Sequence, residues 1–384
     1  MAQGMRKLNE AIAALPEVRE LLLSLDAGTS PIAVSGLSGV HRAQLISAVR
    51  EKTQRPLLIV CADENEANRM ALDLTALLGE EASLLFAREW QLRDRVFASH
   101  GWEQQRIGSL CSLAAGKAPI LVATVDGLMQ RTLPPDALRG AVTDISLGDR
   151  FDLNTLSKKL VESGYTRAET VEGVGQFALR GGILDVYSPA QEKPLRAEFF
   201  GDELDTMGYF DPITQRRTEN VDEAVLLPVA ETEPHLHPQG ISGLCEDLRA
   251  IIARQQRRKT PNQALIETLQ KDCEALENET LFASADRYMA LIYPEFTTAA
   301  SYLPQEAVVA FCDHGNLQRG EKDRAEEFGL LLDSFLTSGT LFGELCDYYA
   351  TMDDLAASLR GRAVIYCDSF LAARYPESLP PKQL

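Results

Sequence analysis

The sequence predicts an α/β protein in which a parallel-sheet domain is interrupted by a smaller antiparallel domain. Short apolar strands alternate with helices early in the chain, as in the strand 57–61 followed by a helix at 64–78. Turn residues then divide residues 179–217 into successive strands, and another buried strand is expected at 306–314. Alternating strands and helices favour a parallel sheet, whereas strands joined by short turns favour an antiparallel one.

The N-terminal part of the chain supplies the first elements of the parallel sheet. Apolar residues at helical spacing predict two short helices within residues 7–25, separated at Pro16 because proline interrupts a helix. Further strands are expected at 31–34, 57–61, 83–86 and 119–124, and further helices at 41–51, 64–78, 107–115 and 125–131.

The turn between the predicted strand 31–34 and the predicted helix 41–51 lies where a phosphate-binding loop would lie, and it contains Gly36 and Gly39. Such a loop has the pattern G-x-x-x-x-G-K-[S/T], with a lysine for the phosphates and a hydroxyl for magnesium. If Gly36 is the first glycine, His41, Arg42 and Ala43 occupy the last three positions of the pattern. Arg42 differs from lysine in shape and donor geometry, and Ala43 has no oxygen for a metal. We expect a loop without nucleotide; weak attraction of an anion by its amides stays open.

The segment 179–217 is predicted to be an antiparallel meander, because runs of β-forming residues alternate with glycine, proline and aspartate turns. Strand alternation gives its third strand two faces. One face carries Leu195, Ala197 and Phe199, and the other carries Arg196, Glu198 and Phe200.

Three stretches of this meander carry a resemblance: RGGILDV at 180–186, RAEFFGDELD at 196–205 and FDPITQRR at 210–217. Together they resemble the domain shared by the excision-repair protein UvrB and the bacterial transcription-repair coupling factors. In that family this domain docks UvrA, so the resemblance implies UvrA as a partner.

The resemblance also implies a degenerate helicase-like domain of the P-loop NTPase type around the docking domain. UvrB inserts a tyrosine-rich hairpin into DNA, whereas this chain has Trp90, Phe97 and Trp102 in the comparable stretch. This difference favours the N-terminal, UvrB-like region of a coupling factor. Where UvrB has an Asp-Glu pair for ATP hydrolysis, this chain has Asp313 and His314, so the second acidic residue is absent.

The resemblance makes Arg180 the first candidate for contact with UvrA, with Arg167, Gln176, Phe177 and Gly181 as its neighbours. A planar guanidinium suits pairing with a carboxylate across an interface. The alternative is an ion pair within the domain. Its candidate partners are Glu198, Asp202, Glu203 and Asp205.

Four segments follow from these patterns. Residues 1–140 and 218–337 are predicted to form the two halves of the helicase-like domain, and residues 141–217 the inserted domain. Residues 338–384 are predicted to be a linker and the truncated start of a further small α/β domain.

A basic cluster stands out within a predicted charged helical stretch at 241–276, which is broken near Pro261. Its members are Arg254, Arg257, Arg258 and Lys259. A solvated helix end and an incidental nucleic-acid contact are both open interpretations.

Composition limits the function classes. The chain has 384 residues, 45% of them hydrophobic, and a formal net charge of -18, which argues against a protein that mainly wraps a phosphate backbone. Its 7 cysteines are scattered without a zinc pattern, so reduced thiols are expected and neither a metal nor a cofactor is predicted. No signal peptide or membrane span is recognised, so a cytoplasmic protein is expected.

Three hypotheses remain at this stage. The first is a non-catalytic module that recruits UvrA to stalled RNA polymerase, with polymerase and DNA bound by other parts of a longer protein. The second is a UvrB-like, ATP-dependent helicase-type repair protein. The third is a structural interaction domain with an unrelated partner.

Overall fold

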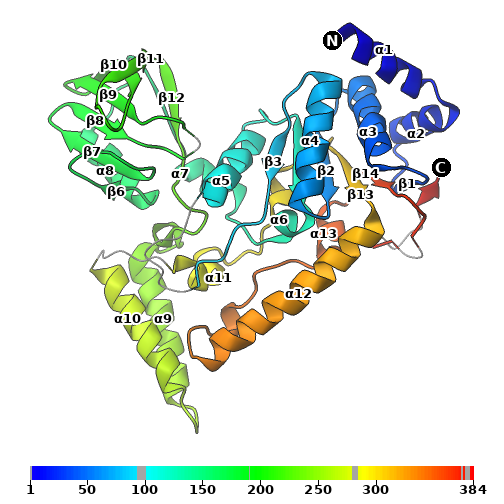
Figure 1. Cartoon of the computed structure of the whole chain (residues 1–384). Helices are drawn as coiled ribbons and strands as arrows, with labels where there is room; N and C mark the ends of the chain where they lie inside the picture. The colour runs from blue at the N-terminus through cyan, green and yellow to red at the C-terminus, as the bar shows by residue number, and fades with distance from the viewer. Residues whose placement is uncertain (1, 93–100, 190, 279–283, 373–374, 377–380) are drawn as a thin grey trace.

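The computed structural model describes residues 2–92, 101–189, 191–278, 284–372, 375–376 and 381–384. It contains a parallel sheet covered by helices, a separate antiparallel sheet and a projecting pair of helices (Figure 1). Phe97, one of the aromatic residues singled out in the sequence, lies outside the described residues. Trp90 packs against Tyr348, with 4.8 Å between the ring centroids, and therefore anchors a loop.

The main sheet has the strand order β15-β1-β14-β13-β2-β4-β3, and all its strand pairs are parallel. Its strands are β1 (Ile32–Val34), β2 (Leu57–Cys61), β3 (Ser83–Leu85), β4 (Ile120–Thr124), β13 (Val308–Cys312), β14 (Ala363–Cys367) and β15 (Lys382–Gln383). The central strands β2, β4, β13 and β14 are buried along their whole length, as expected for a parallel sheet covered on both faces.

Alternate residues of these strands enter two different cores. Leu57 and Ile59 of β2 belong to the core on one face, and Leu58 and Val60 belong to the core on the other. The first core is closed by α1 (Ala2–Ala13), α2 (Pro16–Asp26), α3 (Gly39–Thr53) and α4 (Glu64–Leu78). The second is closed by α5 (Gly101–Ala114), α6 (Val125–Met129), α7 (Pro135–Ala141), α9 (Gly240–Gln256), α10 (Gln263–Glu277), α11 (Met289–Ile292) and α13 (Met352–Ser358).

The prediction that residues 338–384 open a separate small domain is wrong. β14 lies inside the main sheet, where Ala33 of β1 pairs with Tyr366 and Ala310 of β13 pairs with Ile365. Local patterns can predict single strands and helices, but strand order depends on long-range pairing that a local pattern does not contain. β14 and β15 of this segment therefore belong to the parallel-sheet domain.

The second sheet has the order β11-β10-β9-β8-β7-β6. Its strands are β6 (Thr166–Arg167), β7 (Gln176–Arg180), β8 (Ile183–Val186), β9 (Leu195–Phe200), β10 (Glu203–Phe210) and β11 (Arg217–Asn220). One face packs on α8 (Leu153–Glu162) and on the pair formed by β5 (Thr143–Ser146) and β12 (Glu223–Leu226). The parallel and antiparallel sheets predicted from the sequence are thus both present.

The predicted end of the inserted domain at 217 is too early. Ala224 of β12 pairs with Ile145 of β5, and both residues lie in the same core as Leu184. Residues 218–226 were predicted to belong to the helicase-like domain, because the sequence of an isolated apolar strand does not show which sheet it joins. The inserted domain therefore extends at least through β12.

Two further helical features project from or border the main sheet in Figure 1. α9 and α10 form an antiparallel hairpin whose break at Pro261 was predicted, and α12 (His314–Thr337) is a single long helix. Short 3-10 turns lie at Pro234–Leu236, Ala285–Tyr288, Ala299–Tyr302 and Gly343–Leu345.

The cysteines are all free, and among the described residues no helix is both long and apolar enough to cross a membrane.

Candidate functional site

The antiparallel sheet has one face that is covered along its length and one that is covered only in part. Leu195, Ala197 and Phe199 of β9 face the core, as strand alternation predicted. Arg196, Glu198 and Phe200 therefore face the other way. On that side Val171 packs on Ala178 and Phe210 and covers one part of the sheet. We call this second side of the sheet the open face.

A buried carboxylate organises the centre of the open face. Asp185 on β8 has no exposed surface, and the register places it beside Arg196 on β9. Arg196 donates from Nε to Oδ1 at 2.7 Å and from Nη2 to Oδ2 at 2.9 Å, a two-pronged ion pair. The hydrogen bonds to Asp185 raise the pKa of Arg196, and its guanidinium also lies 4.5 Å from the Phe210 ring centroid.

Arg180 reaches the same carboxylate from the end of β7. Its Nη2 donates to Asp185 Oδ2 at 2.6 Å, yet 51% of its side chain is exposed. Asp185 therefore faces two guanidinium groups, and the arginine-rich centre carries one net positive charge. The four acidic partners considered from the sequence were wrong, because the ion-pair partner lies on the adjacent strand at a position the strand pattern did not single out.

A tight turn positions Arg180. Gly181 and Gly182 join β7 to β8, and Gly181 has φ +61°, a conformation that favours glycine. A Cβ on Gly182 would lie 2.7 Å from the carbonyl oxygen of Phe199, so this position needs glycine for close approach of the backbone. Gly181 itself is exposed.

The other three predicted contact residues differ in accessibility. Arg167 is exposed on the edge strand β6. Gln176 is half-buried, and its Oε1 accepts from the backbone amides of Glu172 and Gly173, both at 3.0 Å, so it orders the preceding loop. Phe177 is completely buried in the domain core and cannot contact a partner directly, which corrects its assignment. Alternation along β7 places it on the covered face.

Several residues of the open face were missed as site candidates. Asp185 and Arg196 form the ion-pair centre, and Arg217 on β11 pairs with Glu198 at 3.0 Å. Phe200 is 85% exposed, and Ile183 is partly exposed beside Glu198 on the neighbouring strand. The alternating pattern grouped some of them on one strand, but their grouping across strands requires the register.

The loop between β1 and α3, which lies where a phosphate-binding loop would lie, forms backbone hydrogen bonds with the segment after β14. Gly36 donates from its backbone nitrogen to Ser369 O at 3.3 Å, and Leu37 donates to Asp368 O at 3.0 Å. His41 is exposed, with Nδ1 3.1 Å from Ser38 Oγ. Gly39 begins α3. These amides, which in a phosphate-binding loop would point at a ligand, are thus partly occupied by the segment after β14.

Arg42 and Asp313 are brought together beneath this loop. The buried guanidinium of Arg42 lies 2.7 Å from Asp313 Oδ2 and 3.1 Å from Glu66 Oε1, and it donates to Ser369 Oγ at 2.8 Å. Ala43 is buried in the core. The cation at the position of the phosphate-binding lysine is therefore balanced by two carboxylates of the chain.

His314, at the position of the second acidic residue, is buried against aromatic rings. Its ring stacks on Tyr375 with 5.1 Å between centroids, and its backbone nitrogen donates to Asp368 Oδ1 at 2.8 Å. It is a packing element of the sheet end.

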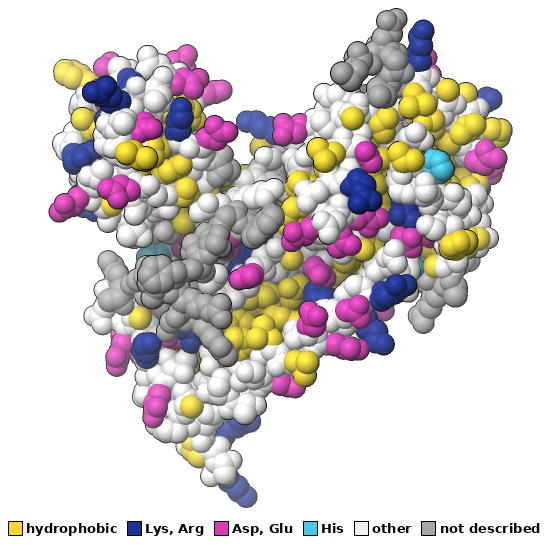
Figure 2. Space-filling view, in the orientation of Figure 1, with side chains coloured by type: hydrophobic (Ala, Val, Ile, Leu, Met, Phe, Trp, Pro, Cys, Tyr) yellow, Lys and Arg dark blue, Asp and Glu magenta, His cyan; other side chains and the backbone are white. Residues whose placement is uncertain are grey.

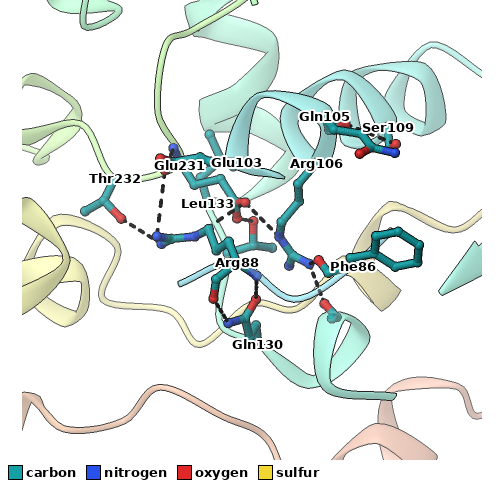
Figure 3. A network of polar contacts seen from close by, with 12 residues as sticks. Phe86, Arg88, Glu103, Gln105, Arg106, Ser109, Gln130, Leu133, Glu231 and Thr232 are labelled. Carbon is teal, nitrogen blue, oxygen red and sulfur yellow. Dashed lines mark hydrogen bonds and ion pairs between the residues drawn. The ribbon is translucent and has the colours of Figure 1, made fainter. Parts of the chain in front are cut away.

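A buried polar network lies where the chain leaves the inserted domain (Figure 3). The Glu231 carboxylate is 2.7 Å from Arg106 Nε and 3.5 Å from Arg88 Nε, and Thr132 Oγ1 donates to it at 2.5 Å. Arg88 also forms a two-pronged pair with Asp286, at 2.7 and 2.9 Å. The inserted domain is therefore tied to the parallel-sheet domain by buried charges, which no local motif indicated.

One group of possible metal ligands also escaped the sequence pattern. Cys245, Cys273 and Glu277 place their ligand atoms within 4.8 Å of one another in the α9–α10 hairpin. Glu277 already pairs with Arg249, and burial raises the pKa of the Cys245 thiol to about 12, which disfavours the thiolate that binds metals. The two thiols fit the apolar seam of the hairpin.

Comparison with known families identifies the inserted domain. Residues 143–231 match the model of the UvrB interaction domain, a span that includes β5, the open face, β12 and Glu231. Over 336 residues, or 86% of its length, the chain is 25% identical to the transcription-repair-coupling factor of Bacillus subtilis.

The chain is a homologue of the transcription-repair-coupling factors. It is 35% identical over 208 residues, 52% of the chain, to the factor of Myxococcus xanthus, and 24% identical over 352 residues, 89% of the chain, to that of Staphylococcus aureus USA300. These alignments cover only 17% to 29% of the coupling factors, so the chain spans less than a third of their length. The family recognised from the sequence is confirmed.

Proposed function

We propose that this chain is a non-catalytic recruiting module of transcription-coupled excision repair and that its open face docks UvrA. The observation that carries the proposal is Arg180, half-exposed and held in place by a buried carboxylate. The match of residues 143–231 to the UvrB interaction domain supports this location, and the coupling-factor relatives support the repair pathway.

The ion-pair geometry prepares Arg180 for a partner. Asp185 is already satisfied by the two-pronged pair with Arg196, so Arg180 uses one nitrogen on the carboxylate and keeps its other donors for a ligand. Because its guanidinium is already oriented, less side-chain entropy is lost on binding. The net positive centre suits a carboxylate on the docking partner.

Apolar side chains on the same face supply an anchor beside the charges. Phe200 is almost fully exposed and Ile183 partly so, although both lie in strands whose other faces are buried. Interfaces combine aromatic and arginine hot spots with a polar rim. We propose that Phe200 and Ile183 are covered when UvrA docks.

The parallel-sheet domain acts in this proposal as a degenerate helicase-like frame that does not hydrolyse ATP. Arg42, paired with Asp313 and Glu66, lies where a phosphate would need the cation, and Ala43 offers no metal ligand. RNA polymerase and the DNA track of a motor are proposed to be bound by other parts of a longer protein.

Titration with purified UvrA tests the docking proposal. We expect Arg180→Ala to weaken binding about 30-fold, or about 2 kcal/mol, as for a central interfacial arginine. Its fold should survive because Asp185 keeps Arg196. The matched control is Arg139→Ala on α7, an arginine of similar exposure that also has an ion pair, with Asp136. Equal affinity of Arg180→Ala and the wild-type chain would refute the assignment.

Titration with ATP separates this proposal from the UvrB-like helicase. Calorimetry in the presence of magnesium should detect no binding at micromolar ATP, because Arg42 is neutralised within the chain. Saturable micromolar binding that requires magnesium would favour the helicase instead.

A further inference from the structure

A basic patch occupies the free end of the α9–α10 hairpin. α9 ends at Gln256, and the connection to α10 begins with Arg257, Arg258 and Lys259, all exposed. Arg254 is exposed in the last turn of α9. We call these four residues the basic tip. Lys and Arg side chains gather at the lowest end of Figure 2, where Figure 1 shows the end of this hairpin.

The basic tip contrasts with the rest of the chain in charge. The formal net charge is -18, but residues 248–266 contain five Lys and Arg residues and no Asp or Glu. Arg249 pairs with Glu277 and Arg254 with Glu344. In the part of the chain that the structure describes, no carboxylate pairs with Arg257, Arg258 or Lys259. The guanidinium of Arg258 donates to Gln255 Oε1 at 3.4 Å.

The ends of the helices do not account for this cluster. Cations in the last turn of a helix stabilise it by interacting with its carbonyl end, which explains Arg254. Arg258 and Lys259 lie beyond the last residue of α9, where that interaction falls away. Concentrating them there costs mutual repulsion, so a partner that neutralises them would be favoured.

The hairpin is long, and the turn after α12 supports it near its end: Gly339 lies against Asn262 and Leu265, and Glu344 pairs with Arg254. α9 has 17 residues and α10 has 15, so the helices are about 25 and 22 Å long. Their seam is filled by buried apolar residues such as Leu248, Ile252 and Leu269. The basic tip is therefore presented on a stiff support.

The composition of the tip favours a nucleic-acid backbone over a protein. The hairpin end, residues 249–266, is fully described and has no large exposed hydrophobic side chain. It therefore lacks the aromatic or aliphatic anchors of protein interfaces. Thr260, Asn262 and Gln263 add polar side chains beside the cations. A set of cations with polar neighbours is what phosphate contacts require. We propose that the basic tip binds the phosphate backbone of duplex DNA without sequence specificity.

Fluorescence anisotropy with a labelled 20-base-pair duplex tests this proposal on the 384-residue chain. We expect a Kd of about 10⁻⁴ to 10⁻⁶ M at physiological salt and tighter binding at about 50 mM salt, because the affinity falls as the salt concentration rises. The triple variant Arg257→Ala, Arg258→Ala, Lys259→Ala should bind at least about tenfold more weakly, with a log-log salt slope shallower by about 2 to 3. Circular dichroism should show an unchanged melting temperature, because these side chains are exposed.

A matched control removes the same charge elsewhere. The triple variant Arg69→Ala, Arg139→Ala, Lys158→Ala changes three exposed residues outside the hairpin and should bind the duplex like the wild-type chain. Equal loss in both triples would show that total charge alone matters and would overturn the proposal. So would undetectable wild-type binding at 50 mM salt, or binding of labelled polyglutamate as tight as that of the duplex, which would assign the tip to an acidic protein.

Discussion

The two sheets each hold a cluster of arginine and acidic residues, and the net charges of the two clusters have opposite signs. In the parallel-sheet domain, one buried arginine, Arg42, faces the carboxylates of Asp313 and Glu66. In the antiparallel sheet, one buried carboxylate, Asp185, faces Arg196 and Arg180. The first cluster satisfies its cation internally, whereas the second leaves a guanidinium half in solvent.

This difference shows how the same chemistry gives either a support or a binding site. A cation surrounded by carboxylates has little left to offer a phosphate. A carboxylate shared by two cations fixes both and keeps one positive charge on the surface. We therefore propose that Arg42 contributes to stability and that Arg180 contributes to recognition.

The largest expected effect comes from Asp185→Asn, which should disturb both folding and recognition in the antiparallel sheet. It removes the charge that holds Arg196 and Arg180, and we expect a local loss of about 2 to 3 kcal/mol. Hydrogen exchange read by mass spectrometry should show weaker protection in β8 and β9. UvrA affinity should also fall about tenfold, because Arg180 is no longer oriented.

Asp136→Asn is the control for this change, since Asp136 is an exposed acidic residue paired with Arg139. It should leave protection and affinity unchanged. Unaltered hydrogen exchange in Asp185→Asn would contradict this prediction, because it would show that the Asp185 carboxylate does not stabilise β8 and β9.

Arg42→Ala is expected to have a smaller effect, confined to the stability of the parallel-sheet domain. It leaves Asp313 and Glu66 without their cation, and we expect a loss of about 2 kcal/mol and a lower melting temperature. Arg42→Lys should restore part of the loss, because it returns the charge without the fork of donors. A melting temperature equal to that of the wild-type chain would show that the internal pairing contributes nothing.

The smallest expected effect comes from Glu233, which lies in the connection between β12 of the inserted domain and α9 of the parallel-sheet domain. Burial and the neighbouring Glu103 raise the pKa of Glu233 well above its usual range, so the folded chain holds a proton that the unfolded chain releases. Stability is then lost as pH rises from the ordinary glutamate range through the raised pKa. Glu233→Gln should remove this decline and stabilise the chain by about 1 kcal/mol at neutral pH.

Thermal unfolding of the chain and of Glu233→Gln across this pH range is the measurement. If the stabilities of the two chains change with pH in the same way, Glu233 has the same pKa in the folded and the unfolded chain, and the prediction is wrong.

Much of the local structure could be predicted from the sequence. The strand 57–61 and the helix 64–78 match β2 and α4 residue for residue, because their apolar spacing and the Asp63 cap are local signals. The meander and its two faces were also predictable from alternation. The wrong predictions concerned the domains to which residues 218–226 and 338–384 belong, since strand pairing is decided by distant partners.

The candidate site was predicted in part for the same reason. Arg180 could be singled out by its place before two glycines, within a stretch that resembles a known docking domain. Asp185 could not, because an aspartate in an apolar strand gains its meaning only from Arg196 on the next strand. Phe177 was assigned to the wrong side, although the alternation of β7 contains that information.

UvrA titration of Arg180→Ala and Arg42→Ala, each paired with a melting curve, tests the division of roles most directly. We predict that Arg180→Ala has a lower affinity for UvrA and an unchanged melting temperature, while Arg42→Ala has a lower melting temperature and an unchanged affinity. Loss of UvrA binding in the folded Arg42→Ala chain together with full binding by Arg180→Ala would contradict it.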